Sequence, residues 1–148
     1  MNELEQIEQH IINHMDEQFI RNCLSCVEAK FIDCCKKGYT NIVKFMIEHG
    51  ADVHARNDFA LFWTSRNGHP EVVKELIAAG ANVHADDDYS LRYASVNGHL
   101  EVVQQLLAAG ADVHADNDWA LKMASRSGHP EIVKLLIAAS SVSHTDSK

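Results

Sequence analysis

A spacing of 30 residues recurs along most of the chain and limits the folds that it can adopt. Two series of glycines keep this spacing: Gly38, Gly68, Gly98 and Gly128; and Gly50, Gly80 and Gly110, with Ser140 in the next place. Two series of histidines keep it as well: His69, His99 and His129; and His54, His84, His114 and His144. A fixed period of roughly 20 to 50 residues indicates a solenoid, in which each repeat packs against its neighbours.

Each repeat has the pattern of helix, tight turn, helix and loop. In the repeat from Asp58, that aspartate can cap the first helix, and Gly68 can end it with a positive φ. Pro70 suits the first turn of the second helix, where no backbone N–H is needed. The second helix then has apolar residues at helical spacing, which predict its buried face: Val72, Val73, Leu76 and Ile77. The pattern predicts an all-α fold.

Composition and charge narrow the classes of function. The chain has 148 residues, 46% of them hydrophobic, which is enough for the core of one domain. Its net charge of −8 argues against general affinity for nucleic acid or anionic membranes. No apolar run is long enough for a membrane span, and the start MNELEQIEQH lacks the apolar core of a signal peptide. We therefore expect a cytoplasmic protein.

The repeat pattern divides the chain into three parts. Residues 1–29 do not fit the repeat well, and their apolar residues at helical spacing predict a helical cap over the first repeat. Residues 30–140 contain about four repeats of 30 residues. The last second helix is expected from Pro130 to Ala139, and residues 141–148 are expected to be a flexible tail.

The segments GHPEVVKELIAAGANVHA and GHLEVVQQLLAAGADVHA resemble the second helix and exit loop of ankyrin repeats. The resemblance covers residues from about Lys30 to Ser140 and implies an ankyrin-type helical solenoid. Ankyrin units usually have about 33 residues, and the missing three fall where the family has its projecting β-hairpin. We therefore expect shortened turns and little β-structure. The 30-residue form, with Asn-Gly-His, resembles the ankyrin proteins of giant DNA viruses of amoebae, which would place the protein in the host cytoplasm.

The residues that differ between repeats lie on one side of the first helix. If Leu61, Thr64 and Ser65 are buried, helical geometry places the variable positions on the opposite side. The resemblance implies that this side lines a concave groove and binds a protein partner. The candidate partner-binding residues are Phe59, Phe62, Trp63, Arg66, Tyr89, Arg92, Tyr93, Val96, Trp119, Lys122, Met123 and Arg126.

Two interpretations of this surface remain open. Aromatic, methionine and arginine side chains are enriched in interface cores, which favours a binding site. Alternatively, the column of Trp63, Tyr93 and Met123 packs between helices as part of the core. The neighbouring column, with Phe62, Arg92 and Lys122, is expected to be exposed. No nucleophile–base pair recurs and no glycine-rich phosphate loop is present, so we expect neither catalytic activity nor a cofactor. Together with the resemblance, this predicts a monomeric protein-interaction module.

An alternative function starts from the N-terminal histidines and cysteines. His10 and His14 are four residues apart, and Cys23 and Cys26 are three apart. Two imidazoles and two thiolates can form a tetrahedral zinc site. Such a site would make the protein a zinc-stabilised regulatory or single-stranded nucleic-acid-binding module. The simpler interpretation is that these cysteines are small apolar residues of the cap, with free thiols in a reducing compartment.

The two histidine series have different expected roles. The resemblance implies that His69 and its equivalents tie adjacent backbone turns together. It also makes His114 a candidate for hydroxylation by an iron- and 2-oxoglutarate-dependent oxygenase that reads Leu106 and Asp112 upstream. The alternative is that this imidazole simply hydrogen-bonds the turn.

Overall fold

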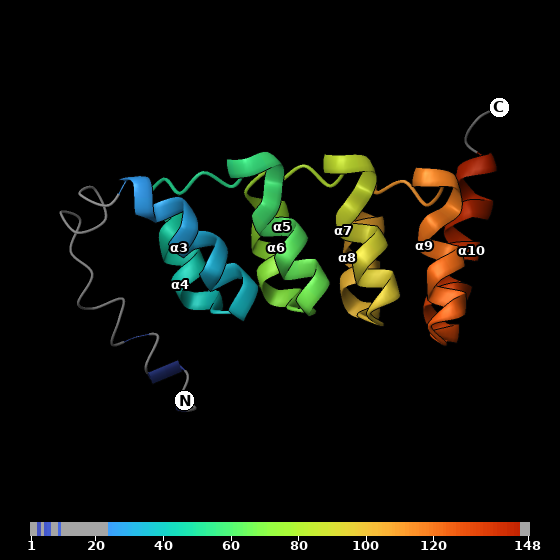
Figure 1. The fold of residues 1–148 in the computed structure, drawn as a ribbon, viewed down its shortest axis with the longest axis horizontal. Helices are drawn as coiled ribbons and strands as arrows, with labels where there is room; N and C mark the ends of the chain where they lie inside the picture. The colour runs from blue at the N-terminus through green and yellow to red at the C-terminus, as the bar shows by residue number, and fades with distance from the viewer. Residues whose placement is uncertain (1–2, 4, 7–8, 10–23, 146–148) are drawn as a thin grey trace.

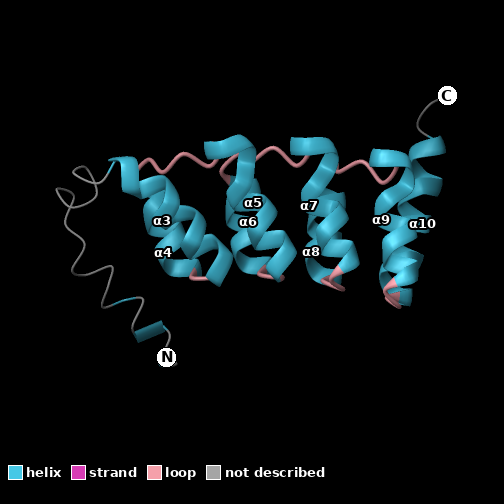
Figure 2. Ribbon diagram, in the orientation of Figure 1, coloured by secondary structure: helices cyan, strands magenta, loops and turns pink. Residues whose placement is uncertain are grey.

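The computed structural model describes residues 3, 5, 6, 9 and 24–145. Residues 24–145 form a row of four helix pairs, shown in Figures 1 and 2. The pairs are α3 (Leu24–Lys37) with α4 (Thr40–Glu48), α5 (Ala55–Asn67) with α6 (Pro70–Ala78), α7 (Ala85–Val96) with α8 (Leu100–Ala108), and α9 (Ala115–Arg126) with α10 (Pro130–Thr145). This part of the chain has no strand, which confirms the expected all-α solenoid.

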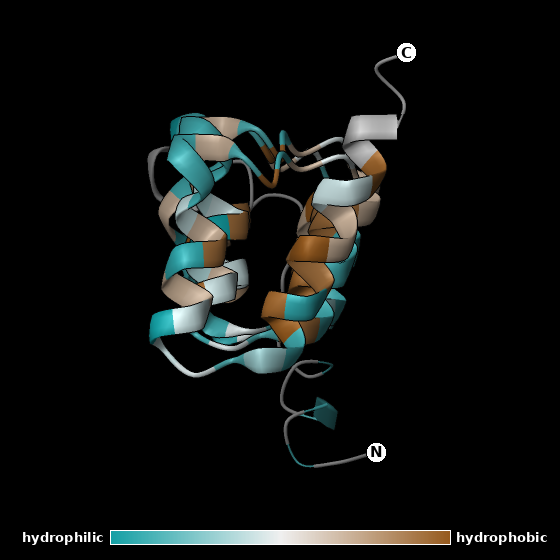
Figure 3. Ribbon diagram, turned by 90° about the vertical axis from the view of Figure 1, so that its right-hand side faces the viewer, coloured by the Kyte–Doolittle hydropathy of each residue, from teal (hydrophilic) through white to brown (hydrophobic). Residues whose placement is uncertain are grey.

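The helices form two layers, which Figure 3 shows in a view along the array. The first helix of every pair lies in one layer, and the more hydrophobic second helices lie in the other. Neighbouring first helices contact each other more extensively than neighbouring second helices do. The layer with the more extensive contacts consists of α3, α5, α7 and α9. We call its side of the array the first-helix face.

The core lies between the two layers and repeats with the sequence. Leu61 and Leu91 of the first helices, and Leu76 and Leu106 of the second helices, are fully buried. Burial of each such side chain contributes about 1.5–3 kcal/mol. Where first helices approach each other, the side chains are small and buried: Thr64, Ser65, Ala94 and Ser95. The equivalent Ser125 is exposed because no described repeat follows it.

Gly68 shows why glycine recurs after the first helix. Its φ of 75° ends α5 in the left-handed region, as the pattern predicted. A Cβ atom at this position would also lie 2.3 Å from Nδ1 of His99 in the next repeat. A larger residue would therefore strain the backbone and displace the histidine ring.

The shortened turn consists of three consecutive left-handed residues. Arg56, Asn57 and Asp58 have φ values of 53°, 59° and 57°, and the next two repeats have the same conformation at 86–88 and 116–118. Asparagine and aspartate tolerate this conformation better than most residues do. The turn replaces the long β-hairpin of a 33-residue repeat, in agreement with the sequence.

The role predicted for Asp58 was wrong. Its carboxylate was expected to cap its own helix, but it accepts hydrogen bonds from the backbone N–H of Asn82, at 2.8 Å, and from Nδ1 of His54, at 3.0 Å. The left-handed turn before Phe59 places the carboxylate against the exit loop of the next repeat. Asp88 makes the same bonds to Asp112 and His84. The aspartates therefore link adjacent repeats.

Two helix boundaries also differ from the prediction. Helix α3 begins at Leu24, so the first repeat starts earlier than Lys30. Helix α10 continues to Thr145, although it was expected to end at Ala139, so residues 141–145 of the predicted flexible tail are helical. Gly110, which is equivalent to Ser140, has a φ of 96°, and serine lacks this freedom, so the last helix does not stop there. The cap predicted for residues 1–29 falls largely outside the described residues and stays a prediction.

Candidate protein-binding face

An aromatic ladder crosses the first-helix face. We use this name for six rings from α5, α7 and α9 that touch in sequence: Phe59, Phe62, Trp63, Tyr89, Tyr93 and Trp119. All six belong to the predicted partner-binding residues, and all are half-buried. The structure therefore brings together side chains that are up to two repeats apart in the sequence.

Three ring contacts connect the ladder from one repeat to the next. The ring of Phe62 lies 4.8 Å from that of Tyr89 and 5.5 Å, edge-on, from that of Tyr93. The ring of Tyr93 lies 5.5 Å from that of Trp119. Aromatic pairs at such distances contribute about 0.5–1.5 kcal/mol beyond their buried area. Each ring is thus supported by its neighbours and keeps part of its surface accessible to a partner.

The hydroxyl groups of the ladder are also ordered. The Tyr89 hydroxyl donates to that of Tyr93 at 3.2 Å. This hydrogen bond is the main reason why the pKa of Tyr89 is raised above its ordinary value. Tyr89 is therefore a neutral hydrogen-bonding group at neutral pH, and it brings no negative charge to the face.

Cationic side chains lie over the rings. The Lys36 ammonium and the Arg66 guanidinium lie 4.4 Å and 4.9 Å from the centre of the Trp63 ring. The Arg92 guanidinium lies 5.4 Å from Tyr89 and 4.9 Å from Trp119. A cation over an aromatic face is attracted by the ring quadrupole, by about 0.5–1 kcal/mol at an exposed site. These contacts orient the basic groups on the face.

The exposure expected for the column of Phe62, Arg92 and Lys122 was correct only for Lys122. Phe62 is half-buried in the ladder. The Arg92 side chain is only 13% exposed, because it forms an ion pair with Asp116 of the next turn and lies against two rings. The Lys122 side chain is exposed, and its ammonium donates to the carbonyl of Asn117.

The column of Trp63, Tyr93 and Met123 is partly packed and partly accessible, so it has features of both a core and a binding surface. Trp63 packs against the hydrophobic core on one side and contacts the cations on the other. Tyr93 and Met123 are half-buried. Two of the remaining predicted residues, Arg66 and Arg126, are exposed, and Val96 is half-buried.

A row of inter-repeat hydrogen bonds fixes the C-terminal ends of the first helices. Nε2 of His69 and Nδ2 of Asn67 both donate to the carbonyl of Lys36, each at 2.9 Å. One repeat later, His99 and Asn97 donate to the carbonyl of Arg66, at 2.9 Å and 3.2 Å. His129 likewise donates to the carbonyl of Val96. The predicted role of these histidines in tying adjacent repeats together is confirmed.

A pocket of about 690 Å³ lies at this end of the face. Its lining residues come from three repeats: Lys36, Trp63, Arg66, Asn67, Asn97 and His99. Of these, only Trp63 and Arg66 were among the predicted site residues. Lys36 was missed, although it precedes Arg66 by one period of 30 residues, because the first repeat is the least regular.

Comparison with known proteins decides the family. The family model described as ankyrin repeats (3 copies) matches residues 31–117 and 87–146. The chain is an ankyrin-repeat protein. No curated protein matches it significantly. Ankyrin-repeat proteins are in general protein-interaction modules and are typically not enzymes.

Most of the alternative zinc site falls outside the part of the ankyrin chain that the structure describes. His10, His14 and Cys23 are outside the described residues, and only the backbone of Cys26 is described, in α3. Among the described residues, no group of histidine, cysteine, aspartate and glutamate side chains could hold a metal ion. The helices in the same part include none that is long and apolar enough to cross a membrane.

His114, the modification candidate, is partly exposed at the last described turn of the array. Its Nδ1 donates to Asp118 at 2.6 Å, and its Nε2 lies 3.2 Å from the Ser140 hydroxyl. Leu106, which an oxygenase would read, is fully buried. The imidazole does hydrogen-bond the turn, and its modification stays a prediction.

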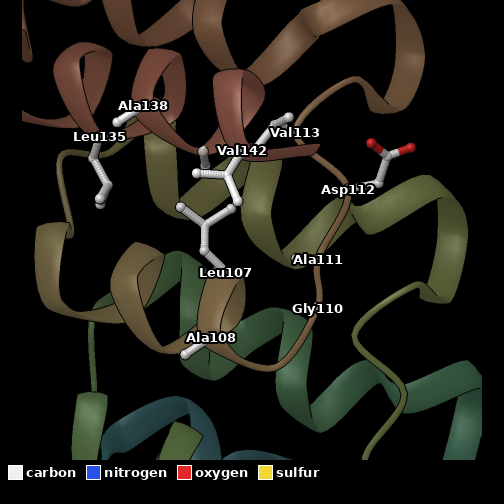
Figure 4. Close-up of a pocket in the computed structure, with 10 residues that line it drawn as sticks. Leu107, Ala108, Gly110, Ala111, Asp112, Val113, Leu135, Ala138 and Val142 are labelled. Carbon is white, nitrogen blue, oxygen red and sulfur yellow. The ribbon is translucent and has the colours of Figure 1, made fainter. Parts of the chain in front are cut away.

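A second pocket of about 690 Å³ lies on the opposite side of the ankyrin array, and Figure 4 shows its lining. It lies between α8 and α10, and Figure 4 shows the side chain of Leu107 below that of Val142, with Leu135 beside them. Val142 is 60% exposed, because α10 extends past the point at which the other second helices end. None of the predicted partner-binding residues lines this pocket.

Proposed function

We propose that this ankyrin-repeat protein binds a partner protein through its first-helix face. The single observation that supports this function best is the aromatic ladder. It continues from Phe59 to Trp119, and every ring in it is half-buried. The ladder thus combines a rigid arrangement with apolar surface that a partner can cover.

The chemistry of the ladder suits a protein surface. Tyrosine, tryptophan and arginine dominate the binding energy of protein interfaces, and here they lie in contact with one another on the first-helix face. Ring contacts and cation–π contacts hold the side chains in place, so binding would lose little side-chain entropy. The interaction role that is general in the family agrees with this chemistry.

We also infer a monomer that acts in the cytoplasm of a host cell. The resemblance of the 30-residue repeats to those of amoebal giant viruses supports the location. The first-helix face is free to receive a partner in a single chain. Size-exclusion chromatography with light scattering should give a mass near 16.5 kDa, and a stable dimer would contradict the inference.

Affinity capture followed by calorimetry tests the function. Partners captured by the wild-type protein are identified by mass spectrometry, produced in pure form and titrated with Tyr93→Ala. Removal of this central ring should weaken binding by about 1–3 kcal/mol, which is the hot-spot range. Gln104→Ala, an exposed position on α8 in the second layer, is the matched control and should bind as the wild type does.

Thermal unfolding of the same proteins separates binding from folding. Tyr93 is half-buried and lies outside the hydrophobic core, so Tyr93→Ala should remain folded. Trp63→Ala should lose more stability, because Trp63 also packs against the core. If every captured partner bound Tyr93→Ala as tightly as the wild type, the proposed function would be wrong.

A further inference from the structure

Two neighbouring cations on the first-helix face, Lys36 and Arg66, have no carboxylate partner within the described residues. Among the described residues, ion pairs join Lys37, Lys44, Arg92 and Lys134 to aspartate or glutamate side chains, but none involves Lys36 or Arg66. The side chains of Lys36 and Arg66 instead lie over the Trp63 ring. In a chain with a net charge of −8, two adjacent cations without acidic partners are a specific feature.

Hydrogen bonds from the following repeat hold the backbone at both of these cations in place. The carbonyl groups of Lys36 and Arg66 each accept two hydrogen bonds from the following repeat. Both side chains therefore project from anchored positions toward the same indole ring, and both line the 690 Å³ pocket. A site that is ordered before binding loses less entropy when the ligand arrives.

The opposite end of the first-helix face has the opposite charge. The left-handed turns carry exposed aspartates there, among them Asp86, Asp87 and Asp116. Asp116 also neutralises Arg92, the cation nearest the middle of the ladder. The pocket thus brings together two cations without acidic partners, while the aspartates of the turns repel anions.

We propose that this pocket binds the carboxylate side chains of an acidic peptide segment in the partner protein. The inference rests on the proposed function and specifies the chemistry of the partner. A carboxylate can accept two parallel hydrogen bonds from the Arg66 guanidinium, and the Lys36 ammonium adds a second positive charge at the same ring. The methylene groups of a glutamate would cover the exposed part of the Trp63 indole.

A peptide fits this charge distribution better than a nucleic acid does. A nucleic-acid strand carries a phosphate charge at every nucleotide and binds along continuous basic grooves. Here the aspartates of the turns border the same face, so a long polyanion would be repelled beyond the pocket. A short acidic segment followed by apolar residues can place its carboxylates in the pocket and its apolar side chains on the ladder.

Nuclear magnetic resonance of the two tryptophan side chains gives a direct test. The full chain contains only Trp63 and Trp119, so their indole N–H signals are assigned with one Trp119→Phe variant. Hexaglutamate, added at low salt, should shift the Trp63 signal in a saturable manner and the Trp119 signal much less. Hexalysine should leave the Trp63 signal unchanged. Added salt should weaken the hexaglutamate effect, because exposed charges are screened.

Charge reversal identifies the cation that is responsible. Arg66→Glu should weaken hexaglutamate binding by about tenfold, since it replaces an attraction with a repulsion. Lys74→Glu changes the net charge by the same amount within the same repeat, but in the second layer, and should alter the affinity less than about twofold. Equal losses of hexaglutamate affinity in the two variants would show that only the net charge matters. That result would overturn the proposal that the pocket binds the peptide.

Two other results would also overturn the inference. No shift of the Trp63 signal with hexaglutamate at low salt would show that the pocket takes no acidic peptide. Equal or tighter binding of hexathymidylate would show that it selects phosphate over carboxylate. If these results occurred while Tyr93→Ala still weakened binding of a captured protein, the proposed function would stand and only the acidic-peptide assignment would fall.

Discussion

Replacement of Asp88 by alanine should show how the shortened turn links adjacent repeats. The Asp88 side chain is 6% exposed, and its carboxylate accepts a 2.8 Å hydrogen bond from the backbone N–H of Asp112 in the next repeat. Asp118 occupies the same place in the last repeat, but its side chain is 45% exposed and no described repeat follows it. The two residues have similar φ values, 54° and 59°. Asp118→Ala is therefore a matched control.

The difference between the two variants isolates the inter-repeat hydrogen bond. Alanine in the left-handed conformation costs about 1–2 kcal/mol at either position. Each variant also loses a hydrogen bond to the histidine four residues earlier, worth about 0.5–1.5 kcal/mol. Only Asp88→Ala also loses a hydrogen bond from a backbone N–H to a charged acceptor, worth about 1.5–3 kcal/mol. Asp88→Ala should therefore be less stable than Asp118→Ala by about 2 kcal/mol.

Urea denaturation followed by far-UV circular dichroism measures the two free energies of unfolding. Both variants should keep the helical spectrum of the wild type in the absence of urea. If their free energies of unfolding agreed to within about 0.5 kcal/mol, the bond between Asp88 and Asp112 would contribute nothing, and the account of the shortened turn would be refuted.

Three further predictions concern single positions. Ser140→Gly should end α10 near residue 140, as Gly110 ends the preceding second helix, and fast hydrogen exchange at residues 141–145 would show this; unchanged protection there would contradict it. Burial raises the pKa of Cys35 from 9.0 to about 12, so the unfolded chain loses its thiol proton first and stability should fall as pH rises above about 9. If the free energy of unfolding of Cys35→Ala, measured by urea denaturation, fell with pH in the same way, the loss of stability would come from other groups. After co-expression with a 2-oxoglutarate-dependent oxygenase, unmodified His114 should predominate, with any hydroxylation appearing there before His84; peptide mapping that found only His84 modified would contradict this.

The repeated features of the fold followed directly from the sequence. The 30-residue period located the buried leucines, such as Leu61 and Leu91, and the glycines that end the first helices. These features could be predicted because each depends on contacts that every repeat makes in the same way. The aromatic ladder was also predicted as a set of residues, since its rings occupy equivalent positions on successive first helices.

Features that depend on two different repeats were harder to predict. A helical projection of one repeat places Arg92 on the exposed side, but it cannot show that Asp116 of the next repeat pairs with it. The bond from Asn82 to Asp58 likewise joins residues 24 positions apart. The longer α10 depends on one residue of the sequence: serine stands at position 140 in place of glycine, so the last helix lacks the residue that ends the others.

Hydrogen exchange of a complex with a captured partner tests the central claim most directly. If the aromatic ladder is the binding surface, the partner should slow amide exchange in α5 and α7, and it should leave the exposed ends of α6 and α8 unchanged. Slower exchange confined to α6 and α8, with α5 and α7 unaffected, would place the partner on the opposite side of the array and contradict the account.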